Sequence, residues 1–358
     1  MKIDQLLPTM AHGDAVGNYT LALRDVIREM GYSSDIYADG IGPNLEGHNI
    51  LPFDNISLSP TDILIYHLST GSKLNYLIDK PACKKMMIYH NITPSHYFFD
   101  YSYDLYRQTK NGLDEVIYLK DKFDYCLADS DYNKQDLISY GYKCDIDVLP
   151  VIIPFSDYAS KPSGVVLSKY HDDGYVNLLF VGRTAPNKKI ENVIAAFYYY
   201  QKYYNRMSRL FLVGTWGGLE KYKSKLDGYI DTLALDNVIF TGHIKFDEIL
   251  AYYKLADVFV CMSEHEGFCV PLVEAMYFDV PIVAAPHSAV PYTLGDSGVL
   301  LDESSPLQAA GAIDALISNE DLRNSVIIRQ RERLSDFSYH TIRSQFETYL
   351  SKFVRHSL

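Results

Sequence analysis

Hydrophobic positions along the first half of the chain form short apolar runs that alternate with longer amphipathic stretches. Short runs rich in Val, Ile and Tyr, bounded by turn residues, predict buried β-strands. Strands are predicted at 3–8, 34–39, 62–67, 85–90, 125–130 and 145–150. Helices are predicted between them, at about 17–30, 72–80, 102–121 and 131–140.

The pattern is interrupted by residues 155–174 and then restarts. This polar segment, FSDYASKPSGVVLSKYHDDG, contains Pro162, Gly164 and Gly174 and has no clear period, so it predicts an interdomain linker. Strands follow at 175–183, 209–214, 237–242, 257–263 and 280–285. Helices are predicted at about 188–205, 217–234, 246–255, 271–278, 305–317 and 319–333, with a last amphipathic stretch at 339–354.

Strands that alternate with helices predict parallel sheets joined by right-handed crossovers. Two such halves in 358 residues predict an α/β fold of two doubly wound domains that face a cleft. In sheets of this kind, ligands bind beyond the carboxyl ends of the strands. The loops that follow the predicted strands are therefore the places to search for chemistry.

The charge and cysteine content narrow the function class. The chain has 45 acidic and 33 basic residues, and a formal charge of −12 argues against a nucleic-acid-binding protein. Its five cysteines are scattered and form no CxxC pair, so neither a disulfide framework nor a zinc site is indicated. The sequence lacks a signal-peptide pattern and an apolar run of about 18 residues, so we expect a cytoplasmic protein, compatible with contact at a membrane surface.

A glycine-containing loop, AHGDAVGNYTLAL (11–23), follows the first predicted strand. Gly13 and Gly17 flank the expected turn into a helix, and Asn18 is a candidate helix cap. Glycines here let the backbone approach a ligand, and helix-start amides favour an anion. A tight strand-to-helix turn without a ligand explains the same residues.

The segment IYHNITP (88–94) places His90 at the end of the fourth predicted strand. We expect its side chain to point into the cleft. A structural hydrogen-bonding role is the alternative to a functional one.

The loop VGRTAPNKK (181–189) follows the first strand of the second half. Arg183 stands at the strand end, and Lys188 stands at the start of the next helix. Two cations beside free helix amides predict a diphosphate site. Alternatively both are ordinary surface charges, and the neighbouring Lys189 is easily mistaken for the functional lysine.

The stretch SEHEGFCVPLVEAM (263–276) carries two carboxylates in different settings. Glu266 is expected in a loop, Pro271 in the first turn of a helix, and Glu274 one turn later. A favourable interaction with the helix dipole explains Glu274 but gives no reason for Glu266. We expect the following backbone amides to point at the cleft: Phe268, Cys269, Val270, Pro271 and Leu272.

These loops suit transfer of a glycosyl group from a nucleoside-diphosphate sugar. Negative charge grows on the leaving diphosphate, and Arg183 and Lys188 would stabilise it. With two cations in place, no metal ion is required. One glutamate would accept hydrogen bonds from the ribose and the other from the sugar.

The sequence resembles family 4 retaining glycosyltransferases, which have the two-domain GT-B fold. The resemblance rests on FVGRTAPNKK, EHEGFCVPLVEAM and VPIVAA over about 175–300, and in the first half on GDAVGN and YHNITP alone. It implies an acceptor-side Rossmann-like domain at 1–157 and a nucleotide-sugar-binding domain at 158–338. Residues 339–358 resemble the C-terminal helix that crosses back to the first domain.

The resemblance also implies roles for individual residues. Those matching Arg183 and Lys188 bind the donor diphosphate, the one matching Glu266 contacts sugar hydroxyls near the reaction centre, and the one matching Glu274 binds the ribose. The residue matching His90 lies beside the donor sugar. Arg183, Lys188, Glu266 and His90 are thus the expected catalytic residues.

The glycine loop matching Gly13 to Gly17 approaches the diphosphate and the acceptor, and residues matching Phe268 to Leu272 offer backbone amides. Cys269 departs from the pattern, because the family often has glycine there. The implied mechanism is retaining and needs neither a metal nor a covalent intermediate, because the donor phosphate helps to deprotonate the acceptor hydroxyl.

The combination of GDAVGN and YHNITP looks most like bacterial surface-polysaccharide enzymes, including mannosyltransferases of lipopolysaccharide O-antigen. GDP-mannose is therefore the first candidate donor, and a glycan or lipid-linked glycan is the expected acceptor. Lys80, Lys84 and Lys85, with the aromatic run at 96–110, either touch a membrane or belong to a helix that packs its aromatics inward. A UDP-sugar transferase, a nucleotide-sugar epimerase or phosphorylase, and a noncatalytic assembly partner remain alternatives, and no motif indicates an oligomeric state.

Overall fold

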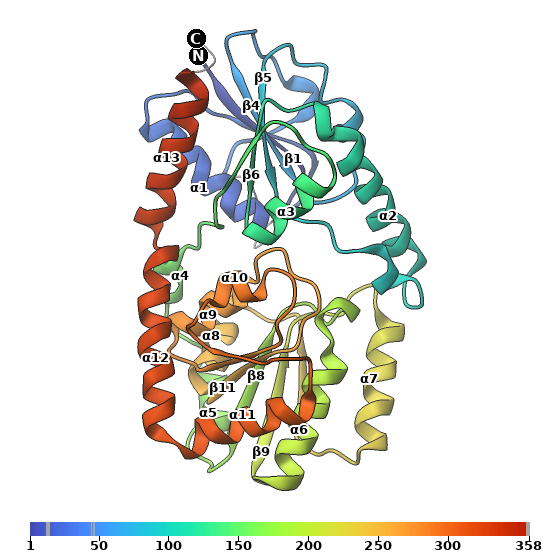
Figure 1. The fold of residues 1–358 in the computed structure, drawn as a ribbon, viewed down its shortest axis with the longest axis vertical. Coiled ribbons are helices and arrows are strands. Elements are labelled where there is room, and N and C mark those ends of the chain that lie inside the picture. The colour runs from blue at the N-terminus through green and yellow to red at the C-terminus, as the bar shows by residue number, and fades with distance from the viewer. Residues whose placement is uncertain (12–14, 44, 46, 356–358) are drawn as a thin grey trace. The chain divides into compact units, whose positions relative to one another are not determined.

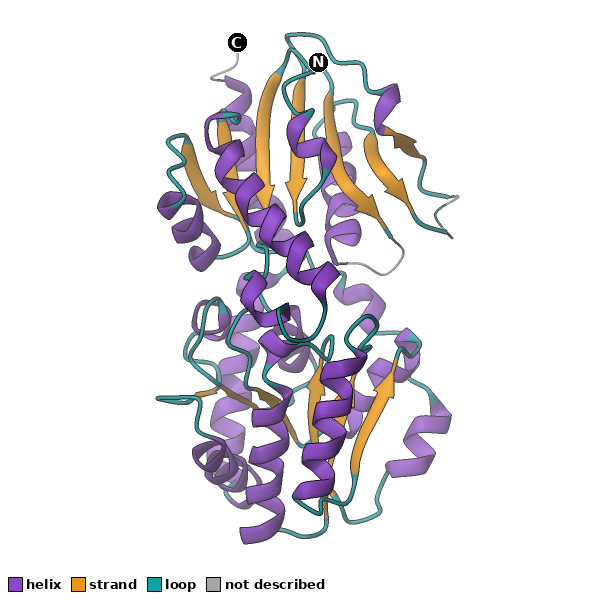
Figure 2. Cartoon of the chain, turned by 90° about the vertical axis from the view of Figure 1, so that its right-hand side faces the viewer, coloured by secondary structure: helices purple, strands orange, loops and turns teal. Residues whose placement is uncertain are grey.

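The computed structural model describes residues 1–11, 15–43, 45 and 47–355. The chain forms two compact units (Figures 1 and 2). The first comprises Met1–His96, Asp104–Ile153 and Phe337–Leu358, and the second comprises Tyr97–Tyr103 and Pro154–Asp336. The chain thus enters the second unit at 153/154, four residues before the expected boundary at 157/158. The chain returns to the first unit between residues 336 and 337, whereas the expected boundary lay between residues 338 and 339.

The first unit contains a seven-stranded sheet in the order β3-β2-β1-β4-β5-β6-β7, and every pairing in it is parallel. The strands are β1 (Ile3–Met10), β2 (Ile36–Ile41), β3 (Ile50–Pro52), β4 (Ile63–Leu68), β5 (Lys84–Tyr89), β6 (Tyr125–Ala128) and β7 (Asp145–Val148). Strand β4 is buried at all six positions, as expected for a parallel strand covered on both faces. The strand order reverses between β1 and β4, which is the topological switch point of this sheet.

The helices of the first unit are α1 (Ala15–Glu29), α2 (Tyr103–Tyr118), α3 (Asp131–Ser139) and α13 (Tyr339–Arg355), with short 3-10 turns η1 (Phe53–Asn55), η2 (Lys73–Tyr76) and η4 (Leu119–Asp121). The turn η3 (Ser95–Phe98) contains the point at which the chain first passes into the second unit. The helix predicted at 72–80 is only the four-residue turn η2. The C-terminal helix α13 packs on this unit, as expected, because the Phe353 ring stacks on Tyr125 with centroids 5.6 Å apart. In the stretch 96–110, Phe98 is buried but Phe99 and Tyr103 are exposed, so not all of its aromatics pack inward.

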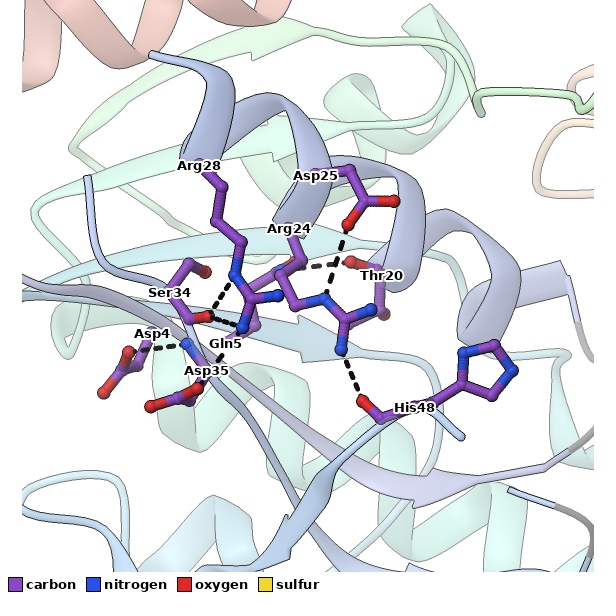
Figure 3. A network of polar contacts seen from close by, with 9 residues as sticks. All are labelled: Asp4, Gln5, Thr20, Arg24, Asp25, Arg28, Ser34, Asp35 and His48. Carbon is purple, nitrogen blue, oxygen red and sulfur yellow. Dashed lines mark hydrogen bonds and ion pairs between the residues drawn. The ribbon is translucent and has the colours of Figure 1, made fainter. Parts of the chain in front are cut away.

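Polar side chains fasten α1 to the first unit (Figure 3). Arg28 donates two hydrogen bonds to the carbonyl oxygen of Ser34, at 2.6 and 2.9 Å, and Arg24 donates one to the carbonyl oxygen of His48 at 2.6 Å. The Gln5 side-chain amide on β1 donates to the carbonyl oxygen of Thr20 at 3.0 Å. This last bond assigns the two ends of the Gln5 side-chain amide, because its nitrogen must be the atom that faces Thr20.

The second unit contains a six-stranded parallel sheet in the order β10-β9-β8-β11-β12-β13. The strands are β8 (Val176–Val181), β9 (Ser208–Val213), β10 (Val238–Gly242), β11 (Val258–Cys261), β12 (Ile282–Ala284) and β13 (Val299–Leu300). The order reverses between β8 and β11, so the loops after these two strands lie at the switch point. Figure 1 shows β8, β9 and β11 within this unit.

The helices of the second unit are α4 (Phe155–Tyr158), α5 (Gly164–Tyr170), α6 (Ile190–Tyr203), α7 (Glu220–Thr232), α8 (Phe246–Leu255), α9 (Val270–Tyr277), α10 (Val290–Leu294), α11 (Pro306–Ser318) and α12 (Glu320–Leu334), with turns η5 (Pro186–Lys188) and η6 (Ser335–Phe337). The linker predicted at 155–174 was wrong in its structure, because α4 and α5 lie within it. Tyr158, Val166 and Tyr170 of this segment are buried, so packing orders it despite its proline and glycines. Strands β3 and β13 and helix α10 were not predicted, since three, two and five residues are too few to show a period.

The ends of β8 and β9 approach each other at two glycines. Gly182 has φ +149° and Gly214 has φ +141°, which are backbone conformations that residues with a side chain rarely adopt. A Cβ atom on Gly214 would lie 2.0 Å from the carbonyl oxygen of Gly182. Among the described residues, no helix is both long and apolar enough to cross a membrane.

Candidate functional site

Lys188 and Glu266 form an ion pair at the switch point of the second sheet. Lys188 ends the turn η5 after β8, Glu266 lies in the loop after β11, and Lys188 Nζ lies 2.5 Å from Glu266 Oε2. The side chains are 20% and 9% exposed. Burial opposes the charge of Lys188, but attraction and hydrogen bonding to Glu266 outweigh it and raise the pKa of the lysine. The lysine predicted to bind the diphosphate and the glutamate predicted to contact the ribose or the sugar thus lie together, and the ammonium stays charged.

Asn187 joins the two loops that carry this pair. Its carbonyl oxygen accepts the amide of Glu264 at 2.9 Å, and its side-chain amide donates to the carbonyl oxygen of His265 at 3.0 Å. Asn187 is buried, so these bonds replace its contacts with water. The sequence did not predict this role. Asparagine is common in turns, and nothing in APNKK indicates that Asn187 bonds to a second loop.

Arg183, at the end of β8, is fastened to the loop that follows β9. Its Nη2 donates to the carbonyl oxygen of Gly217 at 2.8 Å. Burial lowers the pKa of Arg183, and the nearby Glu220 carboxylate partly opposes this effect. An arginine remains a cation in proteins. The guanidinium is therefore a second fixed positive charge on a loop at the carboxyl edge of the same sheet.

Glu274 on α9 is held by two tyrosine hydroxyls. Tyr158 donates to Oε1 at 2.8 Å, and Tyr253 donates to Oε2 at 2.6 Å. Burial raises the pKa of Glu274, while the two hydrogen bonds act in the opposite direction. Each carboxylate oxygen has a second lone pair, so the group can still accept ribose hydroxyls. Tyr158 and Tyr253 were not predicted, because only the tertiary structure brings them beside Glu274.

We expect Tyr253→Phe to raise the KM for the donor about tenfold with a smaller change in kcat. Hydrogen bonds to charged groups contribute about 1.5–3 kcal/mol, and losing this one frees the carboxylate from its expected ribose-binding orientation. Steady-state kinetics with the donor varied would measure the effect. Tyr252→Phe is the matched control, since Tyr252 lies next in the sequence but contacts the Tyr170 and Phe211 rings. Equal KM values for the two variants would contradict the orienting role.

The loop before α9 has a left-handed residue at its end. Cys269 has φ +73°, which explains why glycine suits this position. Two of the five amides expected to bind the ligand are not available as donors. Pro271 has no N–H, and the Leu272 amide donates to the carbonyl oxygen of Cys269 at 3.0 Å. The prediction was wrong for these two residues. For Phe268, Cys269 and Val270 it stays a prediction.

The glycine loop of the first unit differs from expectation. Gly13 lies outside the described residues. Gly17 is the third residue of α1 rather than part of a loop, and a Cβ atom there would lie 3.1 Å from the carbonyl oxygen of Ala11. Asn18 is exposed inside the same helix, so its prediction as a cap was wrong. The helix begins at Ala15, three residues before Asn18, so Asn18 does not stand at its first position.

His90 follows β5, as expected, but its side chain is only 4% exposed and both ring nitrogens have protein partners. Nδ1 lies 2.8 Å from Asp129 Oδ2, and Nε2 lies 3.0 Å from His67 Nδ1. His67 Nε2 in turn lies 2.9 Å from Gln5 Oε1. The expected orientation toward a cleft is therefore not what the structure shows, and His90 belongs to a buried polar array.

The direction of these hydrogen bonds follows from Gln5. Its amide nitrogen donates to Thr20, so its oxygen must accept from His67 Nε2. Burial, with a smaller contribution from His90, lowers the pKa of His67 well below its usual value, so His67 is neutral and its Nδ1 is an acceptor. His90 Nε2 must then donate. Because Nδ1 is engaged by Asp129, neither ring nitrogen of His90 is available as a general base.

Comparison with known protein families finds one matching domain. Residues 168–333 match the model described as "Glycosyl transferases group 1". The matched segment contains α6, β8 to β13 and the loops that carry Arg183, Lys188, Glu266 and Glu274.

Curated relatives match parts of the chain. O-antigen chain mannosyltransferase B of Escherichia coli is 24% identical over 252 residues, which are 68% of this chain and 63% of that protein. A GDP-mannose-dependent alpha-mannosyltransferase of Mycolicibacterium smegmatis is 34% identical over 135 residues, 36% of this chain and 31% of that protein. The matches thus span less than two thirds of these relatives.

Solved structures match nearly the whole chain. HepE of Anabaena, crystallised with UDP and glucose, superposes with a TM-score of 0.76 at 19% identity, covering 98% of this chain and 100% of that one. A sucrose-phosphate synthase of Thermosynechococcus elongatus gives 0.74 at 16% identity, covering 99% and 100%. These likenesses confirm the predicted GT-B fold of two Rossmann-like domains.

Proposed function

Because residues 168–333 match the model described as "Glycosyl transferases group 1", we propose that the protein is a retaining hexosyltransferase that uses a nucleoside-diphosphate sugar. The observation that carries the proposal is the charged Lys188 beside Glu266 at the switch point of the second sheet. A lysine that is mostly covered and yet cationic suits an anionic ligand, and the loops after β8 and β11 lie where ligands of such sheets bind.

The donor diphosphate would be held by Arg183 and Lys188. Arg183 is anchored through Gly217 and Lys188 through Glu266, so both cations are positioned before the ligand arrives. When a phosphate oxygen approaches Lys188, the ammonium has further N–H groups to donate to it. The free oxygen of Glu266 would then accept a sugar hydroxyl, and Glu274 would accept the ribose hydroxyls.

In the transfer step, the bond between the anomeric carbon and the phosphate oxygen breaks while the acceptor oxygen bonds to that carbon on the same face. The acceptor proton passes to the departing phosphate oxygen. His90 takes no proton in this scheme, because its ring nitrogens are engaged by Asp129 and His67. Two protein cations compensate the diphosphate charge, so we propose that transfer needs no metal ion.

GDP-mannose is the first candidate donor, and a glycan or lipid-linked glycan of bacterial surface polysaccharide is the proposed acceptor. The names of the E. coli and mycobacterial relatives support mannose and, for the second, GDP. A UDP-sugar is the second candidate, supported by the UDP and glucose bound to HepE. We place the reaction in the cytoplasm, with the acceptor presented at the inner face of the cell membrane.

A donor screen tests this proposal. Purified protein would be incubated without metal with GDP-mannose and with UDP-sugars, and nucleotide release measured with and without membrane glycan extract. We expect GDP release from GDP-mannose that increases at least tenfold with extract. Release from a UDP-sugar would replace the donor, and product NMR would test whether the anomeric configuration is retained.

The same assay separates the competing functions. An epimerase converts the donor without an acceptor, and a phosphorylase consumes inorganic phosphate. Nucleotide binding without release from any donor, in the presence of extract, would contradict a transferase and favour a noncatalytic assembly partner.

A further inference from the structure

Two cysteines lie close to Glu266 of the candidate donor site. Cys261 ends β11, Cys269 precedes α9, and Glu266 lies in the loop between them. Their thiol and carboxylate ligand atoms all lie within 4.8 Å of one another, and all three residues are buried. Among the described residues, no other set of three His, Cys, Asp or Glu side chains comes together in this way.

We propose that Cys261, Glu266 and Cys269 form a binding site for a thiophilic divalent metal ion, of which Zn²⁺ is the prototype. Two thiolates and a carboxylate are ligands that Zn²⁺ accepts in tetrahedral sites. Three protein ligands leave the fourth position of a tetrahedral site open, whereas structural zinc sites have four protein ligands. This site is distinct from the transfer step proposed above, which uses no metal.

The charges of the occupied cluster balance. Two thiolates and the Glu266 carboxylate would compensate a divalent ion and the Lys188 ammonium, so the occupied cluster carries no net charge. A neutral cluster avoids the main cost of placing an ion in a buried region.

Metal binding would change the donor site through Glu266. The Glu266 carboxylate holds Lys188 at 2.5 Å, and a metal ion would compete for the same oxygens. Glu266 would be drawn toward Cys261 and Cys269 and away from the sugar, so the bound metal would weaken donor binding. This second part of the inference rests on the proposed function, whereas the metal site itself rests only on the cluster.

The chain offers a matched control pair of thiols. Cys126 and Cys144 lie 3.4 Å apart, sulfur to sulfur, in the first unit. Within the described part of the chain, no third metal-ligating side chain joins them. A pair of close thiols is therefore present at both places, and only the cluster in the second unit adds a carboxylate.

The metal site can be tested with Co²⁺ as a spectroscopic probe of the reduced protein. We expect one equivalent to bind with thiolate-to-cobalt absorption and to be displaced by Zn²⁺. Cys261→Ser and Cys269→Gly should each weaken binding at least 100-fold, whereas Cys126→Ser should leave it unchanged. Circular dichroism and thermal unfolding would show which variants retain the native fold.

Three results would overturn the site: no thiolate absorption with wild-type protein, unchanged binding in folded Cys269→Gly, or loss of binding in Cys126→Ser alone.

A separate titration tests the coupling to the donor site. Isothermal calorimetry with GDP-mannose or a UDP-sugar, with and without one equivalent of Zn²⁺, should show at least tenfold weaker binding of the nucleotide sugar in the metal-loaded wild type. Cys269→Gly, measured at the same zinc concentration, corrects for zinc held by the diphosphate itself. Unchanged affinity in a metal-loaded protein would overturn the coupling but leave the metal site. Absence of any nucleotide binding to metal-free protein would instead contradict the proposed function.

Discussion

Replacing Lys188 by methionine is expected to lower kcat/KM for the donor about 100- to 1000-fold. Removing one preorganised group that stabilises developing negative charge typically costs about this factor. The methionine keeps the unbranched side chain up to the position of Cε and removes the ammonium that lies 2.5 Å from Glu266. Single-turnover measurement of nucleotide release would report the loss directly, provided the donor is the one identified by the screen.

Lys189→Met is the matched control for this variant. Lys189 is the next residue and is 27% exposed, but its ammonium pairs with Glu264 at 3.2 Å rather than with Glu266. We expect less than a threefold effect there. Comparable losses in the two variants, or none in Lys188→Met, would contradict the assignment of Lys188 to the diphosphate.

The Lys188→Met variant also leaves Glu266 without its cation in a buried position. Breaking a buried ion pair in this way typically destabilises a protein by about 3–5 kcal/mol. The double variant Lys188→Met/Glu266→Gln removes both charges and should recover much of that stability without recovering turnover. Urea unfolding of both variants therefore separates the loss of stability from the loss of catalysis.

Gly214→Ala is expected to destabilise the second unit by more than about 4 kcal/mol, a size reached only when a substitution cannot be accommodated. The added Cβ would lie 2.0 Å from the carbonyl oxygen of Gly182, and the backbone φ of +141° is itself unfavourable for alanine. The contact is with backbone, so no side-chain rotation relieves it. Thermal unfolding or the yield of soluble protein would measure the effect.

Gly228→Ala provides the matched control. Gly228 lies inside α7, and a Cβ atom there would meet nothing within 4 Å. Because alanine is the better helix former, this variant should be more stable by roughly 0.5–1 kcal/mol. A stable Gly214→Ala protein would show that the ends of β8 and β9 can separate without cost.

The alternation of apolar runs with amphipathic stretches was sufficient to predict most of the fold. The longer strands and helices, such as β4, β8 and α6, were predicted within a few residues, because the hydrophobic pattern of each repeats enough times to be recognised. The structure corrected the segments where that signal is weak. Residues 155–174 carry the composition of a linker, yet α4 and α5 form there because their apolar side chains are buried.

The sequence could also locate the loops of the candidate site but not the partners of each side chain. Lys188 and Glu266 were both selected, on the chemistry of strand-end loops, but nothing in their spacing of 78 residues indicates that they form an ion pair. His90 was selected for its place after a strand. Its burial against His67 and Asp129 depends on β4, β5 and the end of β6 lying side by side.

The sequence by itself determined the alternating α/β architecture and the charged loops at the strand ends, because both are written in local patterns of apolar, glycine and ionisable residues. Only the tertiary structure decided that Tyr158 and Tyr253 hold Glu274, that Asn187 joins two loops, and that Cys261 and Cys269 share a site with Glu266. These contacts join residues from different strands and helices. Their formation depends on sheet order and strand-end geometry, which short-range sequence patterns do not encode.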